Sequence, residues 1–313
     1  MSSIRIQTAG LLTTVQDLGR EGFGPIGVSV SGAADALSLR LGNRLVGNVE
    51  GAAGLEMTLF GGTFLFPEGA VVAVTGSDFG ASLDGAKVSM QTSIEVRPGQ
   101  TLRLGPTRSG ARCYLCVQGG IAVPPFLGSA STHILSGLGG FEGRPLRRGD
   151  ILSIGSSHKP FRKRNVAPHL SEHLLPREVL RVTPGPQMNW FSQSARRSFY
   201  SDTYRVSEQS DRMGLRLEGA PLSQRIRRSM ITEGVSLGAV QVPQGGLPII
   251  LFVEQQTTGG YPKIANVISA DLHRLGQLRP RDEIRFEQVS WEAAHALLVE
   301  QEKMVAFKES ILE

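Results

Sequence analysis

The sequence predicts a mainly β protein of two domains, and three observations lead to that prediction. The chain has 313 residues, enough for about two domains that each bury their own core. Its 38 glycines and 17 prolines are typical of many short strands joined by tight turns. Between residues 55 and 104, apolar runs alternate with glycine- and proline-containing turns at short intervals. That pattern indicates an antiparallel sandwich or barrel.

Residues 33–46 carry the clearest helical pattern of the first half. Apolar side chains recur there at mostly helical spacing, and Ser31 stands where an N-terminal cap is expected. Gly47 and Asn48 then end the pattern. Two strands, at residues 4–6 and 10–20, come before it, and the second ends in a polar turn. We expect the helix to cover one face of a sheet or barrel.

The two cysteines, Cys113 and Cys116, are too few for a disulfide framework in a chain of this length. They lie in an apolar, strand-like run, where a spacing of three places the thiols on opposite faces. No second pair of cysteine or histidine ligands accompanies them, so we predict no metal site.

Prolines and basic residues mark a linker between the two domains. Three prolines and the basic run at residues 162–164 fall between residues 156 and 176. We therefore place an N-terminal β domain at residues 1–156, a linker at 157–178 and a C-terminal β domain at 179–313. The second domain is expected to begin with a strand and a rigid turn, and to end with a helix capped by Ser290.

Charge and hydropathy argue against nucleic-acid binding and membrane insertion. The net charge is +5, but the basic residues are mostly scattered and aromatic residues make up 6% of the chain. An acidic partner subunit explains such a surface better than nucleic acid does. No run approaches the ~18 apolar residues that span a bilayer, and the N-terminus lacks a signal-peptide pattern, so we expect a cytoplasmic protein.

The most informative stretch of the chain follows an apolar, strand-like run at residues 247–253. A buried strand there delivers a polar loop to one end of a core. The loop offers amides, hydroxyls, flexible glycines, an aromatic face and one cation for ligand binding: Gln256, Thr257, Thr258, Gly259, Gly260, Tyr261 and Lys263. An ordinary tight turn of the same composition is the alternative interpretation.

Four charged residues are candidates for chemistry near this loop. Lys263 and Arg212 can polarise an amide or carboxylate oxygen. Glu233 and Glu254 can move protons, and Gln241 is a further polar candidate.

Two other segments could have a function: a possible nucleophile elbow, which its sequence context argues against, and a long glycine-rich loop, whose function stays open. Residues 234–238 match G-x-S-x-G, but a strand is expected after Ser236 where a nucleophile elbow needs a helix. The glycine-rich loop at residues 128–143 is long enough to be functional, and His133 within it is interpreted as a structural histidine. A phosphate-binding loop of the G-x-x-x-x-G-K-[ST] type is absent from the sequence.

Seven segments, taken in order, resemble the allophanate hydrolase subunit 2 family: TTVQDLGR, VSVSGAADALSLRLGNRLVGN, VQGGIAVPPFLGSASTHILSGLGGFEGRPLRRGD, TPGPQMNWF, SEQSDRMGLRLEG, TEGVSLGAVQVPQGGLPII and QQTTGGYPKIANVISADLHRLGQ. The resemblance implies two cyclophilin-like β-barrel domains with a few covering helices, in agreement with the strand pattern. Residues 256–263 match the family's QTTGGYP-[KR] signature. Matches to its RMG and helix motifs imply binding roles for Met213 and Asn43. Glu254 stands where aspartate is common in the family.

The resemblance also implies a function. The leading expectation is the C subunit of an ATP-dependent 5-oxoprolinase, which opens 5-oxo-L-proline, a small cyclic amide, to L-glutamate. Its expected partners are a subunit 1 (B-type) protein and a LamB/YcsF-like A-type subunit, with ATP bound in the assembled complex. The alternatives are the carboxyltransferase half of a biotin-dependent urea or amide carboxylase, with biotin on another chain, and a non-catalytic regulator that binds a subunit 1 partner.

Overall fold

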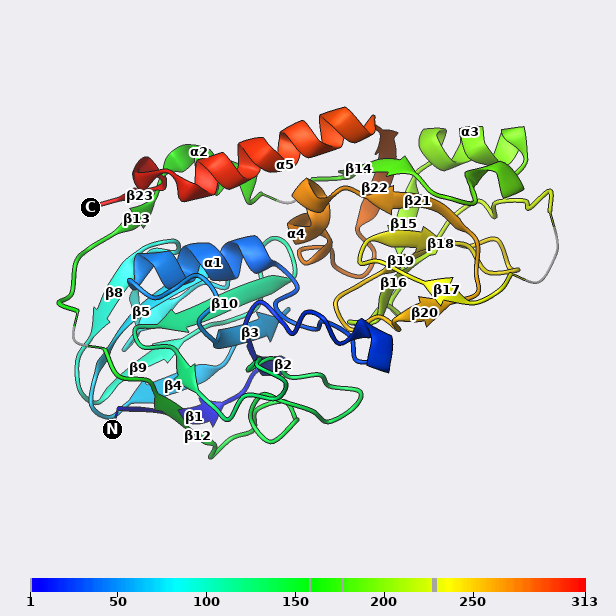
Figure 1. Ribbon diagram of the computed structural model, residues 1–313. Coiled ribbons are helices and arrows are strands. Elements are labelled where there is room, and N and C mark those ends of the chain that lie inside the picture. The colour runs from blue at the N-terminus through cyan, green and yellow to red at the C-terminus, as the bar shows by residue number, and fades with distance from the viewer. Residues whose placement is uncertain (1, 158, 176, 227–229) are drawn as a thin grey trace. The chain divides into compact units, whose positions relative to one another are not determined.

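Strands dominate the computed structural model, which describes residues 2–157, 159–175, 177–226 and 230–313 (Figure 1). The predicted mainly β fold class is confirmed. Two units divide the chain: Met1–Arg20, Ser31–Leu175 and Met304–Glu313 form the first, and Glu21–Val30 with Pro176–Lys303 form the second. The predicted sequential boundaries at residues 156 and 178 stay a prediction.

The first unit contains two sheets. The seven-stranded sheet has the order β11-β12-β1-β4-β9-β6-β7 and the five-stranded sheet the order β2-β3-β10-β5-β8. Their strands are β1 (Ser3–Thr8), β2 (Leu12–Gln16), β3 (Gly54–Thr58), β4 (Thr63–Phe66), β5 (Ala70–Gly76), β6 (Ser82–Leu83), β7 (Ala86–Lys87), β8 (Ser93–Val96), β9 (Gln100–Arg103), β10 (Arg112–Val117), β11 (Ile121–Ala122) and β12 (Ile151–Ile154).

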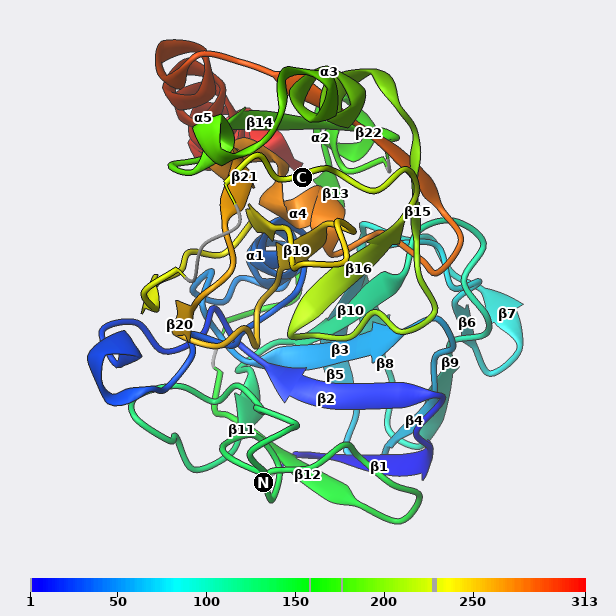
Figure 2. The ribbon, with the colours of Figure 1, turned by 90° about the vertical axis from the view of Figure 1, so that its right-hand side faces the viewer.

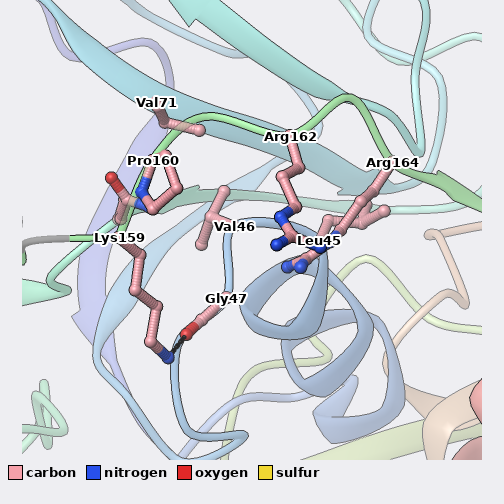
Figure 3. A pocket seen from close by; sticks show the side chains of 9 residues that line it. Leu45, Val46, Gly47, Val71, Lys159, Pro160, Arg162 and Arg164 are labelled. Atoms are coloured by element: carbon pink, nitrogen blue, oxygen red, sulfur yellow. Dashed lines mark hydrogen bonds between the residues drawn. The ribbon is translucent and has the colours of Figure 1, made fainter. Parts of the chain in front are cut away.

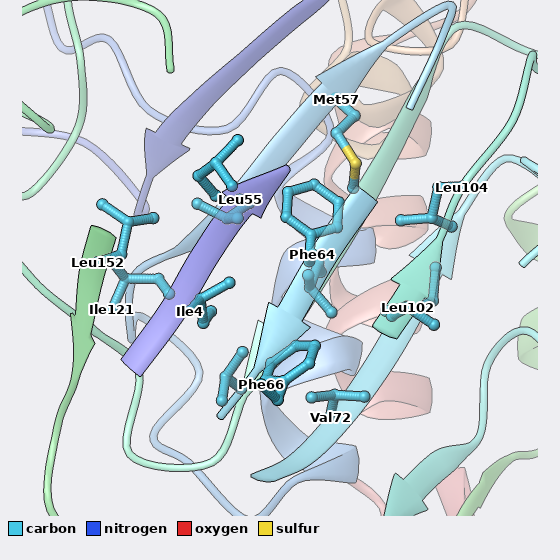
Figure 4. Close-up of a cluster of buried hydrophobic side chains, with 14 of the residues drawn as sticks. Ile4, Leu55, Met57, Phe64, Phe66, Val72, Leu102, Leu104, Ile121 and Leu152 are labelled. Carbon is cyan, nitrogen blue, oxygen red and sulfur yellow. The ribbon is translucent and has the colours of Figure 1, made fainter. Parts of the chain in front are cut away.

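One hydrophobic core joins these two sheets (Figure 4). The seven-stranded sheet contributes Ile4, Phe64 and Leu102, and the five-stranded sheet contributes Leu55 and Val72, all fully buried. The alternation of buried and more exposed residues along β1 and β4 follows from the two-residue period of a strand. Full burial of each such side chain stabilises the unit by roughly 1.5–3 kcal/mol.

Strand β10 is buried on both faces because each face meets a different core. Cys113 packs in the core between the sheets, whereas Tyr114 and Cys116 pack in a second cluster with α1 (Ala36–Leu45). The prediction that the two thiols point to opposite faces is therefore confirmed. Burial raises the pKa of both thiols, so they remain protonated and behave as small apolar side chains.

Helix α1 has a different cap from the expected one. The Asp35 carboxylate accepts a hydrogen bond from the backbone N–H of Ser38 (2.9 Å), so Asp35 is the cap. Ser31 lies earlier, in a left-handed conformation with φ of 57°, and its hydroxyl donates to the Thr132 carbonyl (3.0 Å). The expectation of a Ser31 cap is wrong because the helix begins one turn later. Gly47, with φ of 77°, follows the end of the helix as predicted.

Part of the predicted linker is ordered within the first unit. It contributes β13 (Asn165–Val166), which pairs with β23 (Ile311–Leu312), and the short helix α2 (Pro168–His173). Val166 and Leu170 from this segment pack in the cluster under α1. The single-turn helix η4 (Lys308–Ser310) precedes β23.

The second unit is built around a closed barrel with the order β14-β21-β18-β19-β16-β15-β22 (Figure 2). Its strands are β14 (Val179–Pro184), β15 (Tyr204–Val206), β16 (Gly214–Glu218), β18 (Ala239–Gln241), β19 (Ile249–Leu251), β21 (Lys263–Val267) and β22 (Glu283–Gln288). A two-stranded ribbon of β17 (Glu233–Gly234) and β20 (Thr258–Gly259) lies outside the barrel order. Closure leaves the barrel itself without an unpaired edge.

Helices cover or extend the barrel. Phe199 of α3 (Gln193–Ser201) stacks on Phe286 of β22, with ring centroids 4.4 Å apart. The predicted terminal helix is α5 (Trp291–Ala306), and the Ser290 hydroxyl accepts from the Ala293 N–H (3.2 Å), as expected for its cap. The remaining helices are short: η1 (Gly24–Ile26), η2 (Met188–Trp190), η3 (Ser269–Asp271) and α4 (Leu272–Leu275). Within the described residues, no helix combines the length and apolar character needed to span a bilayer.

Candidate active site

Strand register brings Lys263 and Gln241 to the same end of the barrel. Gln241 on β18 pairs with Lys263 on β21 and with Ile249 at the start of β19. The register between β18 and β21 shifts just before Gln241. Such an irregularity changes the direction in which the neighbouring side chains point. Both side chains are nearly buried, so this end of the barrel presents two polar groups in a restricted space.

The central contact at this end is an ion pair between Lys263 and Glu233. The Lys263 ammonium donates to Glu233 Oε1, and β17 holds Glu233 opposite Gly259 of β20. The Lys263 side chain is 7% exposed, whereas the Glu233 side chain is 44% exposed and open to solvent. The hydrogen bond from Lys263, followed by one from Gln187, lowers the pKa of Glu233. Glu233 is therefore a carboxylate at neutral pH, and it fixes the position of the ammonium.

Gln187 joins this pair and was not predicted from the sequence. Its side-chain amide donates to Glu233 Oε1 (2.9 Å), and its side-chain carbonyl accepts from the Lys263 N–H (3.1 Å). Its own backbone N–H also donates to the Lys263 carbonyl (3.2 Å). Gln187 therefore holds two groups in place from one turn: the backbone of Lys263, and the Glu233 carboxylate that binds the Lys263 ammonium.

The turn that carries Gln187 packs directly on β21. A Cβ built at Gly185 would lie 2.7 Å from the backbone N of Ala265, so only glycine permits this approach. The sequence 184–187 predicted a rigid turn, and the glycine between two prolines was the one signal that a close contact lay there. The partner of that contact was not visible in the sequence.

Replacement of Gln187 by alanine is expected to raise the pKa of Glu233, because the amide no longer donates to the carboxylate. Lys263 still lowers the pKa, so the change is a partial return toward the ordinary glutamate value. An NMR titration of the Glu233 carboxyl carbon measures the shift. Gln301→Ala, a buried glutamine elsewhere in the second unit whose amide donates to the Ala270 carbonyl (2.9 Å), is the matched control. Equal Glu233 pKa values in wild type and Gln187→Ala would contradict this role.

Gln241, Gln256 and Gly259 form a tightly packed group next to Lys263. The Gln256 amide donates to Gln241 Oε1 (3.4 Å). The buried Nε2 of Gln241 has no hydrogen-bond partner among the described residues. A Cβ at Gly259 would lie 2.5 Å from that nitrogen, so the space beside this signature glycine is occupied by the Gln241 amide. A side chain at residue 259 would therefore have to displace the end of the Gln241 side chain.

Gly259→Ala is expected to lower the free energy of unfolding by about 1–3 kcal/mol, since the new methyl group overlaps the Gln241 amide. Gly234→Ala is the matched control in the same two-stranded ribbon, because a Cβ there meets nothing within 4 Å. Thermal unfolding followed by circular dichroism compares the two variants. Equal melting temperatures would show that the ribbon moves aside to accept a side chain at residue 259.

A pocket of about 730 Å³ lies beside the signature loop. Gly260, Tyr261 and Pro262 form one part of its wall, and Tyr261 is 47% exposed. Residues from two other loops complete the described lining: Pro221, Leu222, Ser223, Gln224, Met230, Gln244, Gly245 and Gly246. The described lining contains amides, hydroxyls and apolar groups without a charged side chain. These groups can hydrogen-bond a polar ligand and pack against a small apolar body.

Arg212 and Glu254 form a second ion pair, at the other end of the barrel. Gly214 of β16 pairs with Leu251 at the end of β19, so Arg212 and Glu254 lie beyond the end opposite Gln241. The Arg212 guanidinium donates to Glu254 Oε1, and both side chains are buried. The Glu254 N–H also donates to the Arg212 carbonyl (2.8 Å). The four charged candidates therefore form two ion pairs, Lys263 with Glu233 and Arg212 with Glu254.

Met213 and Asn43 take structural roles in the observed geometry. The Met213 carbonyl accepts from the Phe252 N–H (2.9 Å) and so extends the β16–β19 pairing. Asn43 belongs to α1 in the first unit, where its amide donates to the carbonyls of Glu50 (3.0 Å) and Ala52 (2.7 Å). Its side-chain carbonyl accepts from Asn48 (3.0 Å). Ligand binding by Met213 and Asn43 stays a prediction, and no contact here supports it.

The remaining sequence candidates have structural explanations. Ser236 lies in the turn between β17 and β18 and donates to Asn266 Oδ1 (2.9 Å). The strand predicted after it is confirmed, so the context of a nucleophile elbow is missing. In the glycine-rich loop, Asp17 accepts from the Ser129 hydroxyl (2.7 Å) and the Ala130 N–H (2.6 Å). These bonds fasten the loop to the end of β2. Among the described residues, no group of three or more His, Cys, Asp or Glu side chains is placed to hold a metal ion.

Comparisons with known proteins agree with the resemblance found in the sequence. A family model described as "Carboxyltransferase domain, subdomain A and B" matches residues 26–288. The chain is 41% identical over 291 residues to the 5-oxoprolinase C subunit of Escherichia coli (strain K12), covering 93% of each protein. It is 40% identical over 285 residues to the 5-oxoprolinase C subunit of Haemophilus influenzae, covering 91% of this chain and 90% of that protein.

A solved structure extends the comparison to a longer protein. The crystal structure of the Kluyveromyces lactis urea amidolyase matches 99% of this chain with a TM-score of 0.91 and 33% sequence identity. The chain spans only 20% of that amidolyase chain. The family match covers most of the chain, and the two 5-oxoprolinase relatives match it over nearly their full length. The chain therefore belongs to the carboxyltransferase domain family of subdomains A and B, as the sequence motifs indicated.

Proposed function

We propose that this chain is the C subunit of a 5-oxoprolinase complex that opens 5-oxo-L-proline to L-glutamate with ATP. One observation carries the proposal: the chain is 41% identical to a 5-oxoprolinase C subunit over 93% of both proteins. We further propose that it works with a subunit 1 (B-type) protein and a LamB/YcsF-like A-type subunit, in the cytoplasm.

The contacts of Lys263 with Glu233 and Gln187 support this proposal, because ring opening of a lactam needs a group that stabilises negative charge on the lactam oxygen. Amide resonance makes the carbonyl carbon a poor electrophile, and negative charge develops on the lactam oxygen when that carbon is attacked. A fixed ammonium stabilises this charge more than a mobile one, because no reorganisation is needed during the reaction. Glu233 and Gln187 hold Lys263 in such a fixed position. We assign to Lys263 the role of stabilising the lactam oxygen and to Glu233 that of orienting Lys263.

The pocket beside the loop suits the ring of a small cyclic amide. Tyr261 offers an aromatic face with a hydroxyl. The Gln224 amide nitrogen donates to the Val242 carbonyl (2.9 Å), and its side-chain carbonyl can accept from a lactam N–H. Ligand binding by Gln256, Thr257, Thr258, Gly259, Gly260 and Gln241 belongs to the same proposal. In this proposal ATP is bound in the assembled complex, and none of the described residues of this chain is assigned to it.

A second candidate function is the carboxyltransferase half of a biotin-dependent urea or amide carboxylase. The match to the Kluyveromyces lactis urea amidolyase, with a TM-score of 0.91, favours it. Under this alternative, biotin arrives on another chain and the same end of the barrel receives an amide nitrogen as the acceptor of the carboxyl group.

The two functions are separated by assaying one co-purified complex with both pairs of substrates. We expect the complex to form glutamate from 5-oxoproline and ATP, and to leave urea unchanged when it is given carboxybiotin. Glutamate is quantified by mass spectrometry, and a preparation without this chain is the control. Carboxylation of urea without glutamate formation would replace the first function by the second.

A further inference from the structure

A basic pocket of about 310 Å³ lies in the first unit at the C-terminal end of α1 (Figure 3). Leu45 at the end of the helix lines it with Val46 and Gly47, together with Val71 of β5 and Gln118 after β10. Lys159, Arg162 and Arg164 line it from one segment of the chain, residues 159–164. The volume lies at the lower end of the range for small-ligand pockets, about 300–1,000 Å³.

The backbone that carries the two arginines is fixed in place by Ser93 at the start of β8. The Ser93 hydroxyl accepts from the Arg164 N–H (2.7 Å) and donates to the Arg162 carbonyl (2.9 Å). The Ser93 N–H donates to the Arg164 carbonyl (2.8 Å). With the backbone held on both sides of residue 163, the two guanidinium groups reach the same carboxylate, that of Glu313. Figure 3 shows them close to each other at the end of α1.

The two guanidinium groups already bind one carboxylate. Arg164 donates to Glu313 Oε1 through Nε (3.1 Å) and a terminal nitrogen (3.0 Å), and Arg162 donates to Glu313 Oε2 (3.2 Å). The hydrogen bond from Arg164, with the charge and hydrogen bond of Arg162, lowers the pKa of Glu313. The arginines therefore converge on a single oxyanion, and Glu313 marks the position of that anion.

The single negative charge of Glu313 does not neutralise the positive charges of Lys159, Arg162 and Arg164 at this pocket. Lys159 donates to the Gly47 carbonyl at the C-terminal end of α1, where a cation offsets the negative end of the helix dipole. This capping role accounts for Lys159. The Arg162 and Glu313 side chains are 59% and 53% exposed, so their ion pair contributes little to stability, whereas the Arg164 side chain is 24% exposed. An anion with more charge can therefore displace the Glu313 carboxylate at small cost.

We propose that Arg162 and Arg164 form a binding site for a phosphate group, and that Glu313 occupies the site when the phosphate is absent. A phosphate carries more charge than a carboxylate and offers three oxygens, which suit two guanidinium forks that already converge on one anion. The pocket volume suits a phosphate or pyrophosphate group, whether free or at the end of a nucleotide. The site lies in the first unit and does not depend on the function proposed for Lys263.

Isothermal titration calorimetry with the full chain tests the site. Inorganic phosphate, pyrophosphate and ATP are titrated separately, at constant ionic strength set with chloride. The test variant carries Arg162→Gln and Arg164→Gln. The matched control carries Arg147→Gln and Arg148→Gln, which remove the same charge from two exposed arginines elsewhere in the first unit. Thermal melts confirm that each variant is folded.

We expect saturable binding of pyrophosphate by the wild type, at least tenfold weaker binding by the test variant, and affinity within twofold of wild type for the control. Glu313→Gln is expected to tighten binding severalfold, because the competing carboxylate is lost. Equal affinities for pyrophosphate and ATP indicate that the phosphate alone is recognised, and tighter ATP binding identifies a nucleotide as its source. The proposal is overturned by absence of saturable binding, or by equal affinities in the test variant and the control.

Discussion

Complexes that carry Lys263→Ala are expected to form glutamate from 5-oxoproline at least about 10²–10³-fold more slowly than wild type, the loss typical of removing one oxyanion donor. The variant loses the buried ammonium that Glu233 and Gln187 hold in place. The chain should still fold, because the carboxylate left behind is 44% exposed and can be hydrated. Steady-state assays of the assembled complex give the rate, and circular dichroism reports the folded state.

Two variants separate the role of the Lys263 ammonium from general effects of charge. Lys303→Ala removes an exposed lysine from α5 and is expected to leave the rate unchanged. Glu233→Gln keeps the shape of the side chain but removes its charge, so we expect an intermediate loss that follows from a less firmly held ammonium. Wild-type turnover by a folded Lys263→Ala complex would exclude Lys263 from the active site.

Arg212→Ala is expected to lower the free energy of unfolding by about 3–5 kcal/mol, because it removes the paired cation from a buried carboxylate. A shift of that size corresponds to a large drop in melting temperature for a domain of this length. Chemical denaturation of the isolated chain measures it. The expected effect is on stability, since the Arg212–Glu254 pair lies at the opposite end of the barrel from Lys263.

The double variant Arg212→Met with Glu254→Leu is the control for this interpretation. Replacing both members of a buried ion pair by apolar side chains of similar volume is often neutral for stability, so the double variant should recover most of the loss. It should also retain turnover in the assembled complex. Loss of turnover in a stable double variant would instead give Arg212 or Glu254 a part in the reaction.

Local patterns predicted the elements on which the site is built. The apolar run at residues 247–253 indicated β19, and the polar loop after it does lead into Lys263 at the start of β21. The three-residue spacing of Cys113 and Cys116 correctly placed the thiols in two different cores. In each case the signal lies within a few residues of the chain, where strand periodicity acts.

Those local patterns could not predict contacts between segments that lie far apart in the sequence. Gln187 meets Lys263 across 76 residues of sequence, and only closure of the barrel brings its turn against β21. The separation of Arg212 and Glu254 from Lys263 depends on the register of β16, β19 and β18, which the sequence does not specify. Asp35 and not Ser31 caps α1, because the helix begins one turn after Ser31. Both residue types are common helix caps, so the sequence alone does not distinguish between them.

Add-back of the purified chain to its partner subunits tests the central claim most directly. The partners are first assayed alone for glutamate formation from 5-oxoproline and ATP, and the wild-type chain is then added in increasing amounts. We predict that glutamate formation begins only on addition, rises until the chain matches its partners in amount, and fails with Lys263→Ala. Full activity without the chain, or equal rescue by Lys263→Ala, would contradict the account.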